Sequence, residues 1–128
     1  MKLLLDTHTF IWWDTDPAQL SQQVLDLCHD QTNTLILSVV TVWEIQIKSQ
    51  LGKLALDLPL AELVQSQQDA NGIQLLPVNL AHVLALDTLP RHHKDPFDRL
   101  LIAQANIEGA MLLSKDPAFA AYSVQVVW

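Results

Sequence analysis

Short apolar runs alternate along this chain with longer segments in which apolar residues recur every three or four positions. The runs are typical of strands buried in a parallel sheet, and the longer segments are typical of amphipathic helices. The pattern predicts strands at residues 2–5, 34–37, 74–78, 110–113 and 123–127. It predicts helices at residues 17–29, 39–51, 59–70, 80–86 and 99–108, and a short helical turn after Asp116.

Residues that begin or end helices stand at the boundaries of these segments. Ser38 can cap the helix that follows it, and Asp6-Thr7 predicts a turn after the first strand. Glycines that can end helices stand at Gly52, Gly72 and Gly109. Aspartate precedes proline, a pair that favours a helix start, at Asp16, Asp95 and Asp116.

Strands that alternate with helices predict an α/β fold with three layers. The expected architecture is α/β/α, with a central, mainly parallel five-stranded sheet and right-handed crossovers. With 128 residues, half of them hydrophobic, residues 1–128 are expected to form one domain around one sheet.

The composition narrows the classes of partner. A formal net charge of −7 argues against sequence-blind binding to nucleic acid, which depends on many Lys and Arg contacts to phosphates. No apolar run approaches the roughly 20 residues that span a bilayer, so a cytoplasmic location without membrane contact is expected. The single cysteine, Cys28, lies in a helical pattern and is predicted to be a small buried hydrophobic residue.

Four acidic residues stand out because three of them follow a predicted strand or open a helix: Asp6, Glu44, Asp98 and Asp116. Each has an ordinary structural explanation. Asp6 can bond the backbone of the next helix start, Asp98 and Asp116 can stabilise helix starts, and Glu44 can pair with Lys48 one turn on. The carboxyl ends of parallel strands meet at one edge of a sheet, however, and acids delivered there converge.

Converging acids need a cation. Two like charges about 4 Å apart repel by roughly 4 kcal/mol at an effective dielectric constant near 20. Mg²⁺ prefers oxygen ligands and binds through a few carboxylates together with a substrate phosphate. The sequence therefore predicts a magnesium site for phosphodiester chemistry, in which the metal activates a water.

Other kinds of site find less support. No His-x-x-x-His or Cys/His spacing for zinc occurs, and three glycines do not make a phosphate-binding loop. Four tryptophans could stack on bases, but packing in the core or between subunits is the expected use for most of them: Trp12, Trp13, Trp43 and Trp128.

Four segments make the chain resemble the PIN-domain ribonucleases and, among these, VapC-type toxins of toxin–antitoxin pairs, over nearly its whole length. The most specific runs from His93 to Ala105, HKDPFDRLLIAQA. The others are LLLDTH from Leu3, LSVVTVWEI from Leu37 and LLSKD from Leu112.

The resemblance implies a role for each acid. Asp6 and Asp98 match the principal Mg²⁺ ligands, Glu44 completes the acidic site directly or through water, and Asp116 matches a further acid that holds a metal or its water. Ser114 matches a hydroxyl residue that orients the acids, and Asp95, close to the same pocket, is a candidate both for capping the helix and for supporting the metal ligands. The chain departs from the family after Asp116, where Pro117 and its neighbours supply no further Asp or Asn, which puts a second metal position in doubt.

The implied activity is that of a toxin, a Mg²⁺-dependent endoribonuclease in which Mn²⁺ can substitute, cutting single-stranded or looped RNA to leave a 5′-phosphate and a 3′-hydroxyl. The implied partners are RNA, a cognate antitoxin and a second copy of the chain in a homodimer. Candidate phosphate contacts flank the acids in sequence: Lys48, Lys53, Arg91, His92, His93, Lys94 and Arg99.

Three other protein classes are alternatives to a nuclease. An aspartate-nucleophile phosphatase needs a second Asp two residues after Asp6, where His8 stands. A receiver-like signalling module needs an acid after the third strand, where residues 76–79 carry none. A catalytically silent PIN-like domain that only binds protein or RNA remains open on the sequence alone.

Overall fold

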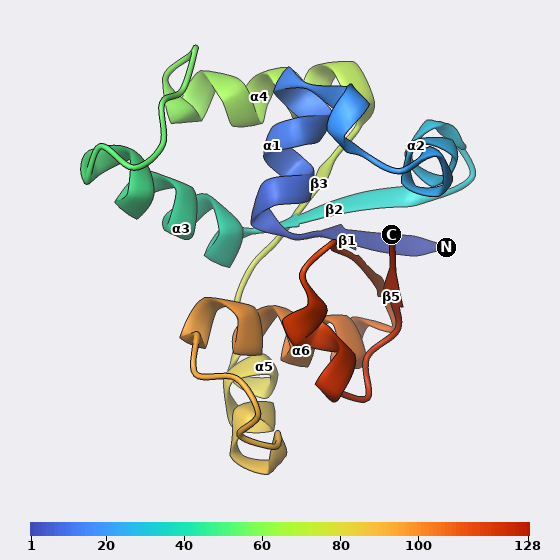
Figure 1. Cartoon of the computed structure of the whole chain (residues 1–128), viewed down its shortest axis with the longest axis vertical. Helices are drawn as coiled ribbons and strands as arrows, with labels where there is room; N and C mark the ends of the chain where they lie inside the picture. The colour runs from blue at the N-terminus through green and yellow to red at the C-terminus, as the bar shows by residue number, and fades with distance from the viewer.

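Five parallel strands form one sheet in the order β3-β2-β1-β4-β5 (Figure 1). The computed structural model describes residues 1–128. The strands are β1 (Lys2–Leu5), β2 (Thr34–Ser38), β3 (Gln74–Leu76), β4 (Met111–Leu113) and β5 (Val126–Val127). The predicted parallel five-stranded sheet is confirmed, although β3 and β5 are shorter than expected.

Helices cover both faces of the sheet, as the predicted three layers require (Figure 1). They are α1 (Thr7–Thr15), α2 (Gln22–His29), α3 (Val39–Gln50), α4 (Leu60–Asn71), α5 (Leu80–Ala85) and α6 (Pro96–Glu108). Three short 3₁₀ helices join them: η1 (Pro17–Gln19), η2 (Leu86–Thr88) and η3 (Pro117–Ala121).

The alternating side chains of β1 divide the core into two halves. Leu3 and Leu5 pack with α1, α2, α3 and α4 on one face, whereas Leu4 packs with α6 and η3 on the other. Because both faces are apolar, β1 reads in the sequence as a continuous hydrophobic run. Cys28 is buried as predicted, and burial raises the pKa of its thiol to about 11.

The segment after β1 differs from its prediction. Asp6 begins a nine-residue helix, α1, where a turn was expected, and the predicted helix at 17–29 is divided into η1 and α2. Ser21 caps α2 by accepting a hydrogen bond from the Val24 amide at 3.1 Å. Asp16 makes no side-chain cap, so the prediction for that residue was wrong.

The other predicted helix ends are largely confirmed. Ser38 accepts a bond from the Val40 amide and caps α3, and Gly72 and Gly109 end α4 and α6 with φ values of 63° and 65°. Positive φ favours glycine because it has no Cβ. No helix is long and apolar enough to cross a membrane.

Candidate active site

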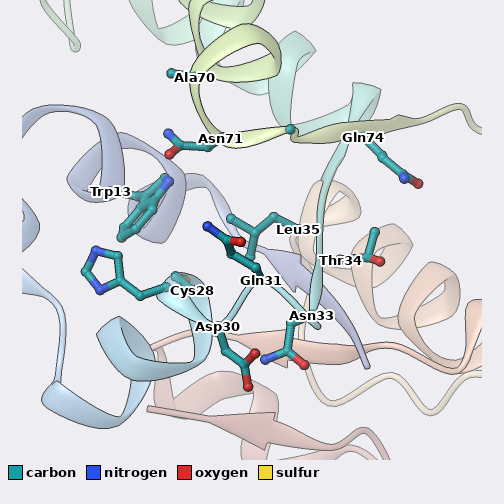
Figure 2. Close-up of a pocket in the computed structure, with 12 residues that line it drawn as sticks. Trp13, Cys28, Asp30, Gln31, Asn33, Thr34, Leu35, Ala70, Asn71 and Gln74 are labelled. Carbon is teal, nitrogen blue, oxygen red and sulfur yellow. The ribbon is translucent and has the colours of Figure 1, made fainter.

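A pocket of about 450 Å³ lies at the amino ends of β2 and β3 (Figure 2). Trp13, Gln31 and Asn71 are among its lining residues. The only carboxylate that lines it is that of Asp30, which accepts two hydrogen bonds from Thr32. None of the predicted acids lies there, and a pocket with a single occupied carboxylate does not fit metal-dependent phosphodiester chemistry.

The predicted acids lie instead toward the opposite, carboxyl edge of the sheet. Asp6 directly follows β1, and Ser114 and Asp116 follow β4, the strand beside it. The chain builds outward from β1 to β3 and then returns to the other side of β1 with β4. The gap between β1 and β4 is therefore a topological switch point, where ligands bind in open α/β sheets.

One hydroxyl joins the segments that follow these two strands. Ser114 donates from its Oγ to Asp6 Oδ2 at 2.5 Å and accepts a bond from the Asp116 backbone amide at 3.0 Å. The other Asp6 oxygen caps α1 by accepting from the Thr9 amide at 2.9 Å. Asp116 caps η3 by accepting from the Ala118 amide. Asp6 and Asp116 are thus both helix caps and neighbours through Ser114.

Glu44 is buried although it carries a charge, with 5% of its surface exposed. Its Oε1 accepts a bond from the Thr7 hydroxyl at 2.8 Å, and its Oε2 pairs with the Lys48 amine at 2.8 Å. The ion pair expected from the spacing is therefore present, but it does not lie on a solvated helix surface. Thr7 follows Asp6 in the chain, so its hydroxyl ties Glu44 to the end of β1.

Asp98 lies in the first turn of α6, which Asp95 caps through the Phe97 and Asp98 amides, as predicted. His93 Nε2 lies 2.8 Å from Asp98 Oδ2. The pKa of the Asp98 carboxyl rises from 3.8 to about 6, mainly because burial disfavours its charged form. The His93 contact opposes the rise, while the negative charges of Asp95 and Glu44 add to it.

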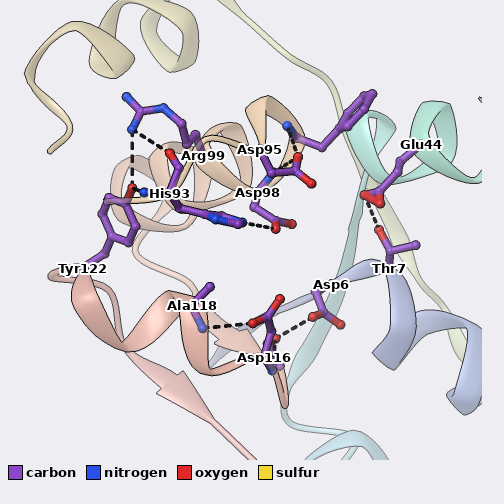
Figure 3. Close-up of polar contacts among 12 residues, drawn as sticks. Asp6, Thr7, Glu44, His93, Asp95, Asp98, Arg99, Asp116, Ala118 and Tyr122 are labelled. Carbon is purple, nitrogen blue, oxygen red and sulfur yellow. Dashed lines mark hydrogen bonds and ion pairs between the residues drawn. The ribbon is translucent and has the colours of Figure 1, made fainter. Parts of the chain in front are cut away.

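Hydrogen bonds connect the segments of three predicted acids, Asp6, Glu44 and Asp116, and Asp98 faces them from α6 (Figure 3). Ser114 links Asp6 to the Asp116 backbone, Thr7 links the residue after Asp6 to Glu44, and the charge of Glu44 acts on Asp98. Figure 3 shows Asp6, Asp98 and Asp116 directed toward a common space. The acids come from four separate segments of the chain.

The donor set at this place fits a hard divalent cation. Ligand atoms of His93, Asp95 and Asp98 lie within 4.8 Å of one another, and of the four predicted acids only Asp98 belongs to this set. Carboxylate oxygens are the ligands that Mg²⁺ prefers, and each oxygen has two lone pairs, so a capping carboxylate can still bind a cation. The raised pKa of Asp98 reflects burial and the repulsion that a cation would relieve.

The structure gives several candidate phosphate contacts other partners. Arg99 donates to the backbone carbonyls of Pro90 at 2.8 Å and Leu89 at 3.3 Å, so it holds the loop before α6 and is not free for a phosphate. Lys48 and His93 pair with site acids. Among the expected basic residues of that loop, Arg91 and Lys94 are exposed and line a pocket of about 580 Å³ beside the acids.

Two polar partners of the acids were not predicted as such. Thr7 was assigned to a turn, and His93 was expected to contact phosphate. Both pairings depend on how α1 and the loop before α6 fold, which no periodic pattern indicates. For His93 the sequence offers one signal, its position five residues before Asp98 at a helix start, from which its ring can reach that acid.

Comparisons with known proteins identify the family to which this fold belongs. A family model described as the PIN domain matches residues 3–125. Ribonuclease VapC22 of Mycobacterium tuberculosis is 27% identical over 115 residues, which cover 89% of this chain and 86% of that protein.

Solved structures share the fold. VapBC2 from Rickettsia felis, bound to a DNA fragment from its promoter, matches with a TM-score of 0.75 and 14% identity over 99% of this chain and 98% of that one. A toxin–antitoxin complex from Klebsiella pneumoniae matches with a TM-score of 0.65 and 16% identity over 98% of this chain and 96% of that one.

Proposed function

Because this chain belongs to the PIN-domain family, we propose that it is a magnesium-dependent endoribonuclease and the toxin of a toxin–antitoxin pair. The observation that supports the proposal is that hydrogen bonds connect the segments of Asp6, Glu44 and Asp116 near the β1–β4 switch point, with Asp98 directed toward the same space. The ribonuclease name of the Mycobacterium tuberculosis relative supports the same activity.

Asp6 and Asp98 are the proposed metal ligands. Asp98 Oδ1 accepts no hydrogen bond from the protein, and Asp6 retains lone pairs beyond its two bonds. When bound, Mg²⁺, or Mn²⁺ in its place, would supply an activated water and positive charge against the phosphate. Glu44 would act through water, because both of its oxygens already have protein partners.

Asp116 and Ser114 position the rest of the site. One Asp116 oxygen caps η3, which leaves the other to hold a water. Ser114 fixes the orientation of Asp6 through its hydroxyl, as residues behind metal ligands commonly do. Exposed Arg91 and Lys94 provide local positive charge for the RNA backbone, which a chain of net charge −7 otherwise lacks.

The proposed partners follow from relatives that have been solved as assemblies. The Klebsiella pneumoniae structure is a toxin–antitoxin complex. By analogy, this chain would pair with a cognate antitoxin in the cytoplasm and form a homodimer. A tail of the antitoxin that covers the acids would silence the nuclease by excluding RNA.

The test is cleavage of single-stranded RNA by the purified protein. Wild type should cut in Mg²⁺, not in EDTA, and should leave 5′-phosphate ends, whereas Asp98→Asn should abolish cutting because it removes a ligand charge. Asp16→Asn is the matched control, since it makes the same change at an exposed aspartate beside a helix start that lies outside the site. Undiminished cutting by Asp98→Asn would refute the assignment. RNA binding without cutting by wild type would favour a silent binding domain.

A further inference from the structure

The four tryptophans fall into two groups. Trp13 is buried in the core, and Trp12 and Trp128 pack against each other with ring centroids 5.9 Å apart. These three meet the expectation of core packing. Trp43 does not, because 57% of its surface is exposed. An exposed indole offers a large, flat apolar surface to a ligand.

Trp43 has an aromatic partner in a distant part of the chain. Its ring lies 5.2 Å from that of Phe97, at an interplanar angle of 78°. Edge-to-face packing is a favoured arrangement of two aromatic rings, and it holds the exposed indole in place. The backbone of Phe97 is fixed, because its amide donates to Asp95 in the cap of α6.

Both rings adjoin the proposed active site in the chain. Glu44 follows Trp43 in α3, and Asp98 follows Phe97 in α6. Successive residues of a helix point about 100° apart, so each helix turns an acid inward and an aromatic ring toward the rim. The two rings thus contact each other beside the acid group, where α3 and α6 approach.

We propose that the Trp43–Phe97 pair is the binding site for one nucleobase of the RNA, next to the phosphate that is cut. The inference rests on the proposed function and names a contact that the function does not require. Sequence-tolerant recognition of single strands uses stacking of bases on aromatic side chains. Base and phosphate are joined covalently in a nucleotide, so a nucleotide whose phosphate lies at Asp98 places its base beside these two rings.

A base fits this surface better than a protein side chain does. The pair is a small aromatic patch that continues directly into carboxylates, a combination that matches a base joined to a metal-bound phosphate. One exposed aliphatic residue, Val39 at 38%, lies one turn before Trp43 on α3, whereas Leu80, Val83 and Leu84 lie together on α5. That second surface has the character expected of a protein contact.

The test compares an intact RNA with two RNAs that each lack one base. The position at which wild type cuts the intact RNA is mapped first. One abasic RNA then lacks the base on the 5′ side of that position, and the other lacks the base on its 3′ side. At one position, removal of the base should lower wild-type kcat/KM by roughly 5- to 150-fold. Trp43→Ala should lower kcat/KM on the intact RNA by a similar factor, with no further loss on the abasic RNA.

Two variants control for structure. Trp43→Phe keeps an aromatic face and should retain most of the activity and the base dependence. Leu51→Ala removes an equally exposed apolar side chain at the end of the same helix and should change neither. The melting temperature of each variant shows whether the fold is kept.

Three results would overturn the inference. Equal cleavage by Trp43→Ala and wild type would do so while leaving the nuclease intact. An equal loss of kcat/KM by Trp43→Ala on intact and abasic RNA would also overturn it. So would a change in the oligomeric state of Trp43→Ala without base dependence, because Trp43 would then belong to an interface between two copies of the chain. If wild type does not cut RNA at all, the proposed function fails, and an RNA-binding measurement then tests the base site. RNA must quench the tryptophan fluorescence of wild type, and Trp43→Phe must remove that quenching; otherwise the inference fails too.

Discussion

Asp98 shows how one residue can serve a site at the expense of stability. Its carboxyl is partly buried beside His93, Asp95 and the charge of Glu44, and its pKa rises to about 6. An unfolded aspartate titrates near 3.9. Above pH 6 the native protein must therefore hold a charge that the unfolded chain hydrates more easily, which weakens the fold.

Replacement of Asp98 by asparagine should stabilise the metal-free protein. The native state binds more protons than the unfolded chain between about pH 4 and pH 6, so wild type loses stability as the pH rises through this range. In EDTA at pH 8, Asp98→Asn should gain on the order of 1 kcal/mol in unfolding free energy, discounted for solvent screening. The gain should vanish below pH 4.

Urea denaturation at pH 8 and pH 4 measures both values. Asp16→Asn, which alters an exposed acid, should show no such difference between the two pH values. A loss of stability in Asp98→Asn at pH 8 would mean that the charged carboxylate is well compensated by His93, contrary to its raised pKa.

The acids could be predicted from the sequence, whereas most of their contacts could not. Asp6 and Asp116 follow apolar runs that define strands, so their place at the sheet edge follows from the pattern. The contact between His93 and Asp98 depends on the conformation of a loop that Arg99 holds through carbonyl groups. No local propensity encodes such a loop.

At the scale of elements, α1 was the main failure of prediction. Its sequence, THTFIWWDT, is rich in β-branched and aromatic residues that favour strands over helices in isolation. Phe10 and Trp13 are buried on one side of the helix, and Asp6 supplies its cap. Tertiary packing and one capping residue thus override a weak local preference.

The cap gives Asp6 a structural role that can be separated from its chemical one. Asp6→Ala should lower the unfolding free energy by about 1 kcal/mol relative to Asp6→Asn, because asparagine also accepts the bond from the Thr9 amide. Both variants should lose RNA cleavage, since neither keeps the charge. Denaturation curves in EDTA compare the two folds, and equal stability would show that the cap contributes little.

Elsewhere the elements followed the pattern closely. α3, α4 and α6 begin and end within a few residues of their predicted bounds, because serine, asparagine-glycine and aspartate-proline signals mark them. Where two signals compete, as at Asp16 and Ser21, the prediction joined what the structure divides. Predicted helix boundaries are wrong where several neighbouring residues could cap the helix.

At the scale of the molecule, strand order decides where the acids meet. The order β3-β2-β1-β4-β5 sets β1 in the centre, so acids from both halves of the chain reach one edge. The alternation of strands and helices predicts a parallel sheet, but it does not give the order of its strands. The convergence of the acids is therefore a property of the topology.

Metal binding should stabilise the whole fold. A cation held by Asp6 and Asp98 binds only the native state, and at 100 times its dissociation constant it would add about 2.7 kcal/mol. The melting temperature of wild type should rise with Mg²⁺ and return with EDTA, while Asp98→Asn should respond much less. NaCl at equal ionic strength is the control, and an equal rise with both salts would indicate screening of the net negative charge.

The buried thiol has a practical consequence for labelling the protein in solution. Cys28 is only 8% exposed, and burial raises the pKa of its thiol to about 11, so it reacts slowly with maleimides at neutral pH. A second cysteine at an exposed helix position such as Ser66 would then take up a dye or spin label alone. The native chain can therefore serve as the unlabelled control, and Cys28 does not have to be removed before labelling.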